Sequence, residues 1–243
     1  MILKDKNAIY EALKAGRRVD VVRFMLPPDR DQRLSEIAEE ARRRKVKVMV
    51  NARFKEASGK GGPITNVEAE VEEFKYVELK QLLDGAKAAG KAAQVVALDH
   101  IQDPRNLGAV LRSAAAAGAA GVIIQQKRCC PVTAVVYETS CGGAEHVPVA
   151  MVTNLANTLR IFKDEGFWVF GADERAEKNV AEEDLKIPLV WVLGTEGRGL
   201  HRLVRENCDF LVKIPTSRDF TSLNVSVAAG ILLFEGVRQK SAL

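Results

Sequence analysis

Six short apolar runs beyond residue 93 constrain the fold of this chain more than any other feature of its sequence. Each run is six or seven residues long, and segments with a helical pattern separate most of them. Strands that are buried on both faces have this character, whereas a strand with one wet face alternates apolar and polar residues. The sequence therefore predicts a mostly parallel sheet with helices packed on both faces. The predicted strands span 94–99, 121–126, 147–152, 167–173, 189–194 and 210–215.

The first 76 residues follow a different pattern, in which helices and strands alternate. Gly16 is suited to end the first helix, because glycine is the preferred residue just beyond a helix end. The last predicted strand alternates apolar with acidic residues, which is typical of a strand with one face in water. The expected elements are helices at 4–15 and 30–45 and strands at 19–26, 46–50 and 67–74.

A segment rich in glycine, alanine and lysine separates these two patterns, and we expect it to be a helix that frays into a linker. A chain of 243 residues is long enough for a small domain joined to a medium one. The predicted fold class is α/β, with a small domain over 1–76, a linker over 77–93 and a larger domain over 94–243.

Composition and charge indicate a globular protein, with 47% hydrophobic and 28% charged residues. The net charge of +4 is compatible with a phosphate-bearing partner but does not require one. The four cysteines form no CxxC pair and the three histidines have no zinc spacing, so we expect neither disulfides nor a metal. No apolar run is long enough to span a bilayer. These features favour a cytoplasmic protein of the reducing cytosol, without a membrane partner.

The segment 98–119 is the first of three that carry candidate chemistry. A strand ends at Asp99, and a helix is expected to begin near Pro104 or Asn106, because both residue types favour helix starts. The helix body is mostly alanine, valine and leucine, with Arg112 as its only charge. A guanidinium in such surroundings is costly to desolvate unless an anion faces it. Arg112 is therefore a candidate for anion binding, and the alternative is an arginine that reaches water at a helix edge.

The second segment, 189–204, joins a buried strand to a helix through the turn Gly-Thr-Glu-Gly-Arg-Gly, which begins at Gly194. Its glycines allow a tight turn and a close approach of the backbone to a ligand. Glu196 places an acid inside this turn, where the backbone is exposed. Taken alone, such a glycine pattern is compatible with many functions.

The third segment, 214–239, leads from an Ile-Pro pair into a long apolar helix that opens near Ser222 and Asn224. Ser222 is a favourable N-cap residue, which is a structural role. Asn224, expected in the first turn, is a poorer helix former and so indicates a functional role. The apolar body from Val225 to Phe234 is either core or a subunit interface.

The order and spacing of these segments closely resemble the three motifs of the SpoU/TrmH family of RNA ribose 2′-O-methyltransferases. The motifs are N-x-G-x-x-x-R after a strand, then L-G-x-E-G-x-G, then an Ile-Pro followed by S-L-N-V-S-V-A. The resemblance covers roughly residues 94–239. The stretch 216–221 departs from it, being bulkier and more charged than the small residues that family members often carry there. The N-terminal part, where NAIYEALKAG leads into VDVVRFML, is similar to the small L30e-like RNA-binding domain of the rRNA-modifying branch.

This resemblance implies a catalytic domain with a trefoil knot, which connection rules alone argue against. It implies S-adenosylmethionine as co-substrate, held mainly by backbone groups at Gly194, Ile214 and Leu223, and no metal. It also implies that Arg112 orients or deprotonates a ribose 2′-hydroxyl, with other polar residues shaping the site or orienting Arg112 and the RNA. The implied catalytic set is Arg112, Asn106, Glu196, Ser222 and Asn224.

The resemblance further implies an RNA partner and a homodimer that buries the helix from Val225 to Phe234. A guanosine of 23S rRNA is the first choice of substrate, and a tRNA ribose is the alternative. Basic residues of the first domain are candidates for RNA contact, although they are equally well a solvated helix face. These residues are Arg17, Arg18, Arg23, Arg42, Arg43, Arg44 and Lys45.

Two other classes of function have to be weighed against this interpretation. A nucleotide-dependent dehydrogenase would share the buried parallel strands, but the first strand of the second domain leads into HIQDPRN without a glycine fingerprint. A non-catalytic RNA-binding module would share the whole fold. The joint presence of the polar motif residues favours an enzyme over that module.

Overall fold

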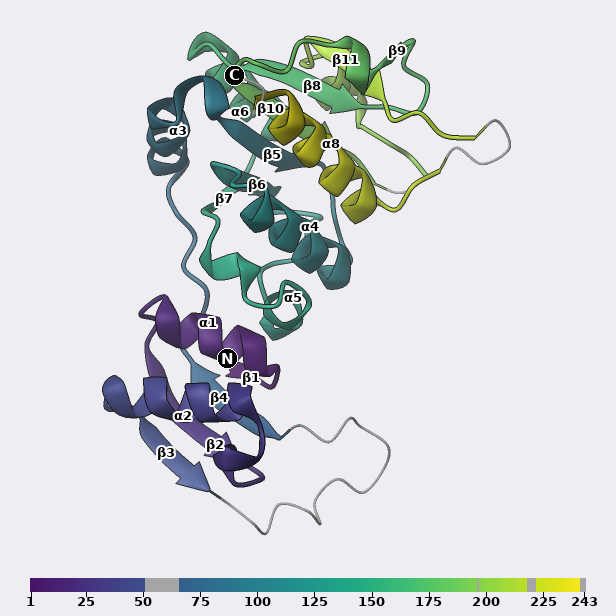
Figure 1. Cartoon of the computed structure of the whole chain (residues 1–243). Coiled ribbons are helices and arrows are strands. Elements are labelled where there is room, and N and C mark those ends of the chain that lie inside the picture. The colour runs from purple at the N-terminus through teal and green to yellow at the C-terminus, as the bar shows by residue number, and fades with distance from the viewer. Residues whose placement is uncertain (51–65, 196, 218–221, 241–243) are drawn as a thin grey trace.

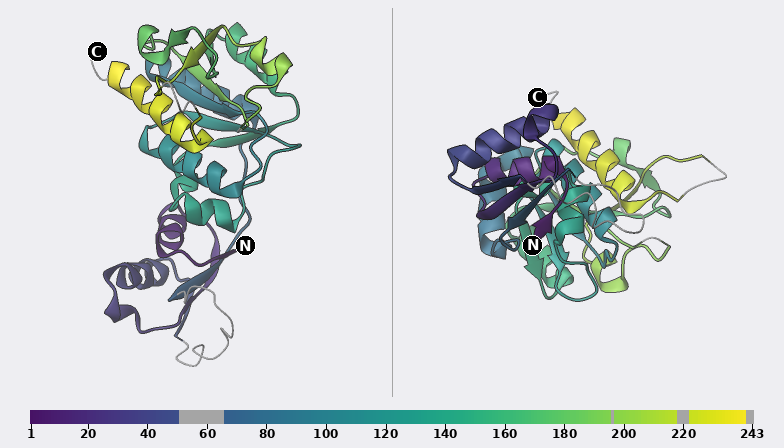
Figure 2. Two further views of the ribbon diagram at one scale, coloured as in Figure 1. Left: turned by 90° about the vertical axis from the view of Figure 1, so that its right-hand side faces the viewer. Right: turned by 90° about the horizontal axis from the view of Figure 1, so that it is seen from below.

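The computed structural model describes residues 1–50, 66–195, 197–217 and 222–240. These residues form two lobes joined end to end, with the N-terminal lobe at the bottom of Figure 1 and the C-terminal lobe at the top. The views in Figure 2 show the same division from two other sides. Both lobes combine helices with a sheet, so the predicted α/β class is confirmed.

The N-terminal lobe is a four-stranded sheet with two helices packed against it (Figure 1). In the strand order β1-β4-β2-β3, β2 and β3 are parallel, and β4 is antiparallel to both β1 and β2. Asp5 and Asp31 cap the helices, because each side chain accepts a hydrogen bond from a backbone N–H three residues later. The elements are β1 (Ile2–Leu3), α1 (Lys6–Lys14), β2 (Val19–Phe24), a 3-10 turn (Pro28–Arg30), α2 (Gln32–Arg43), β3 (Lys47–Val50) and β4 (Val67–Val71).

The C-terminal lobe is built on a seven-stranded sheet in which every pair of neighbouring strands is parallel. The strand order is β7-β6-β5-β10-β8-β11-β9. All six predicted strands are present, with ends within two residues of those expected, and only the short β9 was not predicted. The strands are β5 (Gln94–Leu98), β6 (Gly121–Gln125), β7 (Val149–Val152), β8 (Trp168–Ala172), β9 (Lys178–Asn179), β10 (Leu189–Leu193) and β11 (Phe210–Lys213).

Helices cover both faces of this sheet, as the continuous apolar runs predicted. Val96 of β5 belongs to the same buried cluster as residues of α4 and α8, whereas the adjacent Val95 belongs to a cluster with residues of α3 and α6. Successive strand residues point to opposite faces, so the sheet lies between two helical layers. The helices are α3 (Leu79–Ala88), α4 (Pro104–Ala116), α5 (Ala134–Thr139), α6 (Leu155–Asp164), α7 (Arg202–Arg205) and α8 (Val225–Lys240), with 3-10 turns at Gly90–Ala92, Gly143–Glu145 and Val180–Glu182.

A buried polar contact fixes α8 against the centre of the sheet. Gln94 is buried at the start of β5, where it accepts a hydrogen bond from Trp191 Nε1 at 3.0 Å and donates one to the Leu233 carbonyl at 3.3 Å. A Cβ atom on Gly236 would lie 2.1 Å from Gln94 Oε1, so a larger residue there would displace the Gln94 amide from these two contacts. The contact therefore holds α8, which follows the third motif segment, next to β5, which leads into the first motif segment.

The segment 77–93, expected to frame the domain boundary, consists largely of α3. Leu82 and Leu83 of this helix are buried in the core beneath the C-terminal sheet. A Cβ atom on Gly121 at the start of β6 would lie 2.5 Å from Leu82 Cγ, which shows how closely α3 packs there. The helical part of the predicted linker therefore belongs to the packing of the C-terminal lobe, and the exact domain boundaries stay a prediction.

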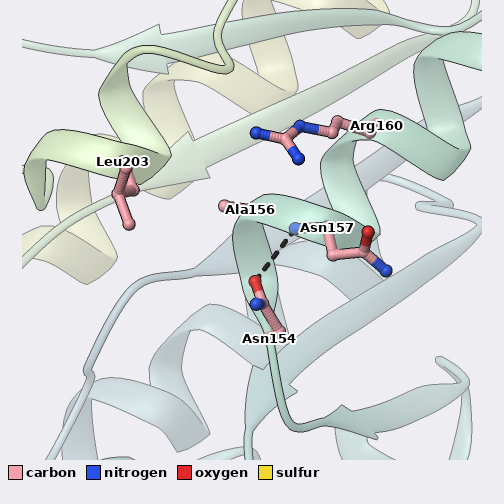
Figure 3. A pocket seen from close by; sticks show the side chains of 5 residues that line it. All are labelled: Asn154, Ala156, Asn157, Arg160 and Leu203. Atoms are coloured by element: carbon pink, nitrogen blue, oxygen red, sulfur yellow. Dashed lines mark hydrogen bonds between the residues drawn. The ribbon is translucent and has the colours of Figure 1, made fainter.

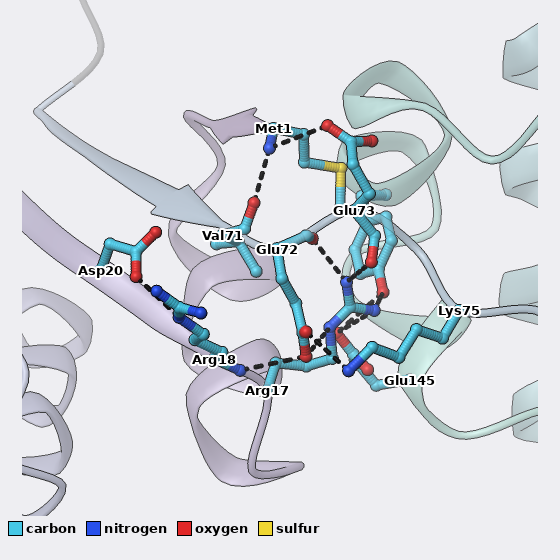
Figure 4. A network of polar contacts seen from close by, with 10 residues as sticks. Met1, Arg17, Arg18, Asp20, Val71, Glu72, Glu73, Lys75 and Glu145 are labelled. Carbon is cyan, nitrogen blue, oxygen red and sulfur yellow. Dashed lines mark hydrogen bonds and ion pairs between the residues drawn. The ribbon is translucent and has the colours of Figure 1, made fainter.

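Arg17 lies at the junction of the two lobes, at the centre of the polar network in Figure 4. Its guanidinium donates to the carbonyls of Glu72 and Glu73 at 2.7 and 2.9 Å, and to the hydroxyl of Tyr137 in the C-terminal lobe. That hydroxyl donates to Glu145 at 2.9 Å, and Glu145 lies 3.7 Å from the guanidinium. Burial raises the pKa of both Tyr137 and Glu145. Arg17 therefore joins the lobes and is not available on an open RNA-binding face.

Among the described residues, no helix is both long and apolar enough to cross a membrane. All four cysteines are free in the structure. The cytoplasmic location stays a prediction.

Candidate functional site

The three motif segments meet at one edge of the large sheet. Asp99 follows β5, Gly194 follows β10, and Ile214 follows β11. The three strands are parallel, with β10 beside β5 and only β8 between β10 and β11. Carboxyl ends of parallel strands form one edge, which is where α/β sheets usually bind their ligands.

Asn106 and Asn224 join the first motif to the third. Asn106 lies in the first turn of α4, which begins at the predicted Pro104 directly after the N-cap Asp103. The side-chain amide of Asn224 donates a hydrogen bond to Asn106 Oδ1 at 2.9 Å. Asn224 Oδ1 in turn accepts from the backbone N–H and the hydroxyl of Ser226, at 2.9 and 2.6 Å. Because α8 begins at Val225, the prediction that Asn224 lies within its first turn is wrong, and Asn224 acts as a cap just before the helix.

Arg112 lies on a different side of α4 from this contact. Six residues separate it from Asn106, which places it about 120° around the helix. Its side chain is exposed, and Nη1 donates to Cys141 Sγ at 3.2 Å. The backbone of Gly143 packs so closely on Arg112 that a Cβ there would lie 3.0 Å from Arg112 Cα. The free protein therefore presents Arg112 at a helix edge, open to a ligand from outside.

The glycine turn after β10 depends on its glycines for steric reasons. A Cβ atom on Gly194 would lie 2.2 Å from the backbone of Gly199, because the turn folds back on itself. Thr195 and Gly199 close the turn with two backbone hydrogen bonds of 2.9 and 3.2 Å. Gly197 and Gly199 have φ values of 81° and 66°, in the left-handed region that glycine adopts without strain. The predicted tight turn is confirmed.

The remaining predicted site residues are less well defined by contacts. Ile214 is partly buried and packs against the main core, and Leu223 is partly buried next to the exposed Ser222. Glu196 and residues 218–221 of the atypical loop lie outside the described residues. The cofactor-binding and catalytic roles of all these residues stay predictions.

Asp99, His100 and His201 form a cluster that was not predicted. Asp99 is fully buried, and its Oδ1 accepts a hydrogen bond from His100 Nδ1 at 2.6 Å. Asp99 Oδ2 accepts from the backbone N–H and from Nδ1 of His201, at 2.7 and 3.1 Å. The two imidazole rings lie 4.0 Å apart, centroid to centroid. His100 and His201 are 101 residues apart in the sequence, a separation that matches no known motif. Only the pairing of β5 with β10 brings them together.

This cluster opens into a pocket of about 580 Å³ beside the glycine turn. His100 and Arg128 border the pocket with φ values of 64° and 62°, which are uncommon for residues other than glycine and cluster at functional sites. The pocket is lined by His100, Gln102, Arg128, Thr195, Arg198 and His201.

A second hollow, of about 280 Å³, lies between α6 and α7 (Figure 3). Asn154 caps α6 by accepting a hydrogen bond from the Asn157 N–H at 3.0 Å, and Arg160 donates to Asn207 Oδ1 at 2.8 Å. Leu203 of α7 closes the other side. Its polar groups serve local structure and none of the described motif residues lines it, so we assign it no function.

Several basic residues of the N-terminal lobe are already paired with acids. Arg23 lies 2.6 Å from Glu70 across two strands. Arg43 and Arg44 both lie 2.7 Å from Glu40, and these two guanidiniums lower the pKa of Glu40 to about 2. Glu40 therefore offsets part of the charge of this run, which is what a solvated helix face would show, while Arg42 and Lys45 stay exposed.

Two family profiles match successive parts of the chain. The profile described as the SpoU rRNA Methylase family matches residues 93–234. The profile described as RNA 2′-O ribose methyltransferase substrate binding matches residues 6–77. The first match alone spans more than half of the chain.

Relatives resemble the chain over nearly its whole length. YacO of Bacillus subtilis, a putative TrmH family tRNA/rRNA methyltransferase, is 38% identical over 236 residues, covering 97% of this chain and 94% of the relative. The SpoU methyltransferase AviRb from Streptomyces viridochromogenes, in complex with AdoMet, has a TM-score of 0.81 at 22% identity, covering 100% of this chain and 91% of that one. A TrmH/SpoU tRNA modifying enzyme from A. aeolicus has a TM-score of 0.56 at 28% identity, covering 68% and 83%. The likeness to AviRb confirms the overall fold, whereas the trefoil knot and the L30e-like character stay predictions.

Proposed function

The chain belongs to the SpoU/TrmH family of RNA methyltransferases, and we propose that it transfers a methyl group from S-adenosylmethionine to a ribose 2′-hydroxyl of RNA. The observation that carries this proposal is the hydrogen bond between Asn106 and Asn224. It joins the first and third motifs at the edge of the sheet where the glycine turn of the second motif also lies.

The residues around the glycine turn fit S-adenosylmethionine. Thr195 Oγ1, next to Gly194, is buried and has no hydrogen-bond partner among the described residues, so it is placed to bond a ligand bound at this turn. We expect backbone groups at Gly194, Ile214 and Leu223 to hold the co-substrate. When bound, S-adenosylmethionine supplies an electrophilic methyl group, so the chain has mainly to orient the reacting hydroxyl, and no metal is required.

Arg112 is best suited to position the RNA. A guanidinium has a pKa above 12, and lowering it to neutrality would cost on the order of 7 kcal/mol. An RNA phosphate nearby would stabilise the charged form and make deprotonation harder still. Forked N–H donors bind a phosphate and a hydroxyl in fixed geometry, and Arg112 is exposed where such a ligand can reach it. The proposed catalytic set also includes Asn106, Glu196, Ser222 and Asn224.

Methyl transfer from labelled S-adenosylmethionine to bulk RNA tests the reaction directly. We expect Arg112→Lys and Arg112→Ala to retain their fold and their affinity for the co-substrate. Both variants should lose methyl transfer by on the order of a hundredfold, because neither keeps the forked donor geometry.

Arg105→Ala is the matched control, because Arg105 is an exposed arginine on the same helix. An Arg112→Ala protein with near wild-type activity would remove Arg112 from the mechanism, and no transfer by the wild type to any RNA would refute the reaction.

The substrate that we propose is 23S rRNA, at a guanosine, with a tRNA ribose as the alternative. Support comes from the substrate-binding profile over residues 6–77. Because Arg43 and Arg44 are paired with Glu40, we expect the exposed Arg42 and Lys45 to contribute more to RNA binding. Methylation of 23S rRNA and tRNA transcripts in parallel, followed by mass mapping of the modified ribose, decides between the two substrates.

We also propose a homodimer formed through α8. Val227, Ile231 and Phe234 are 50%, 39% and 48% exposed and follow the helical spacing of one face. Large apolar side chains that line up in this way favour burial against a partner. Sedimentation at micromolar concentration should show a dimer that Phe234→Glu dissociates, and a wild-type monomer under these conditions would contradict the proposal.

A further inference from the structure

The pocket beside the glycine turn is lined mostly by hydrogen-bond donors. Arg128 and Arg198 carry permanent positive charges, and His100 and His201 can add two more. None of the six lining residues is acidic. A concave surface of this kind concentrates positive potential, which attracts anions.

Asp99 is the only acid in contact with the two rings in the described part of the chain, and it lies behind them, fully buried. Its oxygens accept from Nδ1 of each histidine, so Nε2 of each ring is the nitrogen left for the pocket. The backbone N–H of His201 also donates to this carboxylate. Asp99 therefore fixes the orientation of both rings. Its negative charge interacts with the rings from inside the protein and does not line the pocket.

The spacing of the rings makes an anion the natural ligand. Two rings with centroids 4.0 Å apart would repel each other if both were imidazolium, and negative charge beside them would reduce this repulsion. Asp99 supplies one negative charge from behind. An anion in the pocket would supply the second and would also neutralise the two arginines.

A metal ion is the competing ligand for the same cluster. The carboxylate oxygen and the ring nitrogens lie within 4.8 Å of one another, which is compatible with metal coordination. None of the described lining residues is acidic, so a divalent cation in this pocket would face the guanidiniums of Arg128 and Arg198 with Asp99 of the cluster to offset them. Charge therefore favours the anion.

We propose that His100 and His201, oriented by Asp99 and assisted by Arg128 and Arg198, bind a phosphate group of the RNA backbone. The identification of the phosphate as that of RNA rests on the proposed function. The pocket shares Thr195 and Arg198 with the glycine turn, and Gln102 on its rim precedes α4 by two residues. A phosphate held here lies close to the motif residues, where it can fix the register of the RNA relative to the reacting ribose.

Binding by histidines makes the interaction stronger at acid pH, because only the imidazolium adds charge. Among the described residues, the charged groups around the rings are Asp99 after β5, Arg128 after β6 and Arg198 after β10. Cys208 also lies near Asp99, and burial together with the neighbouring carboxylates raises the pKa of this thiol to about 12, so it adds no charge in this range.

Titration of the full-length protein with inorganic phosphate tests the site without any variant. The chain has only three histidines, so their ring signals can be followed individually by nuclear magnetic resonance. Phosphate at pH 6 should shift the signals of His100 and His201 and leave that of His146, which contacts Glu11 at the lobe junction, unchanged. Absence of a phosphate-dependent shift would overturn the proposal. A response of both rings to Zn²⁺ at micromolar concentration, with none to phosphate, would assign the cluster to a metal instead.

Variants then test whether the phosphate belongs to RNA. Replacing both residues, as His100→Gln with His201→Gln, should weaken binding of bulk RNA on the order of tenfold at pH 6 and less at pH 8. The slope of log affinity against log salt should fall by about 0.7 to 0.9 for the lost phosphate contact. His146→Gln should change neither quantity. An unchanged salt slope would overturn the proposal.

Affinity for S-adenosylmethionine, measured in parallel by calorimetry, shows whether the pocket binds the RNA phosphate or the carboxylate of the co-substrate. We expect the double variant to keep this affinity. Loss of co-substrate affinity with intact RNA binding would assign the anion to the carboxylate of the co-substrate and overturn the proposal. If the wild type transfers no methyl group but shows the phosphate response and the altered salt slope, the phosphate site stands and only the proposed reaction fails.

Discussion

Asn224 donates a hydrogen bond from its side-chain amide to Oδ1 of Asn106, across 118 residues of sequence. The same Asn224 caps α8 through Ser226, so one side chain both starts the C-terminal helix and fixes the beginning of α4. Asn224 could not be replaced by a residue with only donors or only acceptors without loss of one of these contacts. The pair ties the geometry of the site to the packing of two helices.

A double-mutant cycle on this pair should show strong coupling. Asn224→Ala loses both the cap and the contact to Asn106, and we expect it to lower the free energy of unfolding by about 1 to 2 kcal/mol. Asn106→Ala should also lose the contact, but it leaves the cap of α8 in place. The double variant should be less destabilised than the sum of the single variants, which chemical denaturation can measure. Strict additivity would mean that the hydrogen bond contributes nothing in solution.

The close fold of the glycine turn predicts a specific effect of one added methyl group. In Gly194→Ala the new Cβ would meet the backbone of Gly199 at 2.2 Å, so the turn must shift. We expect this variant to lose most of its affinity for S-adenosylmethionine, as measured by calorimetry, with a smaller effect on RNA binding. Gly85→Ala is the matched control, since a Cβ in that helical position meets nothing within 4 Å and should stabilise the fold slightly. Equal co-substrate affinity of wild type and Gly194→Ala would contradict the role of this turn.

The strands and helices could be predicted because their signals are local. Continuous apolar runs give buried strands, and the residues Asp103, Pro104 and Gly118 mark the ends of α4 by their backbone chemistry. The order of the strands could not be predicted in the same way, because it depends on which strands pair in the folded chain. The cluster of Asp99 with His201 was missed for this reason, since it exists only because β10 lies next to β5.

The basic residues show a different limit of sequence reasoning. Arg17 was grouped with possible RNA contacts, but its partners Glu72 and Tyr137 are distant in sequence and hold it at the lobe junction. The partner of Arg43 and Arg44 was, by contrast, visible in the sequence. Glu40 precedes them by three and four residues, which is the spacing of ion pairs along one helix face.

The junction itself should be sensitive to the loss of Arg17. Arg17→Met removes the donors to the Glu72 and Glu73 carbonyls and leaves Glu145 buried without its cation. We expect a loss of about 3 kcal/mol in the free energy of unfolding, which is typical when one member of a buried ionic network is removed. Small-angle scattering should also report a wider range of lobe orientations.

Arg18→Met is the control for this change, because the neighbouring Arg18 side chain is 77% exposed and pairs with Asp20 at the surface. Its loss should have little effect on stability. If Arg17→Met were as stable as Arg18→Met, the polar network would not be what holds the lobes together.

Lys240, at the end of α8, should make stability depend on alkaline pH. Burial lowers the pKa of its ammonium to about 8, and Nζ donates to the Ala93 carbonyl at 2.9 Å. The unfolded chain, in which the pKa of lysine is near its ordinary value, then binds more protons than the folded one above about pH 8. Stability contributed by this residue must therefore rise with pH from about 8 to about 10.5, and below pH 8 it is constant at its lowest value.

Lys240→Met should raise the free energy of unfolding at pH 7 by about 1 kcal/mol, with the carbonyl of Ala93 left to water. The difference between wild type and variant should shrink as the pH increases through this range, as followed by denaturant titrations at each pH. A difference that stays constant from pH 7 to 10.5, or that grows, would show that the ammonium is well solvated in the folded protein.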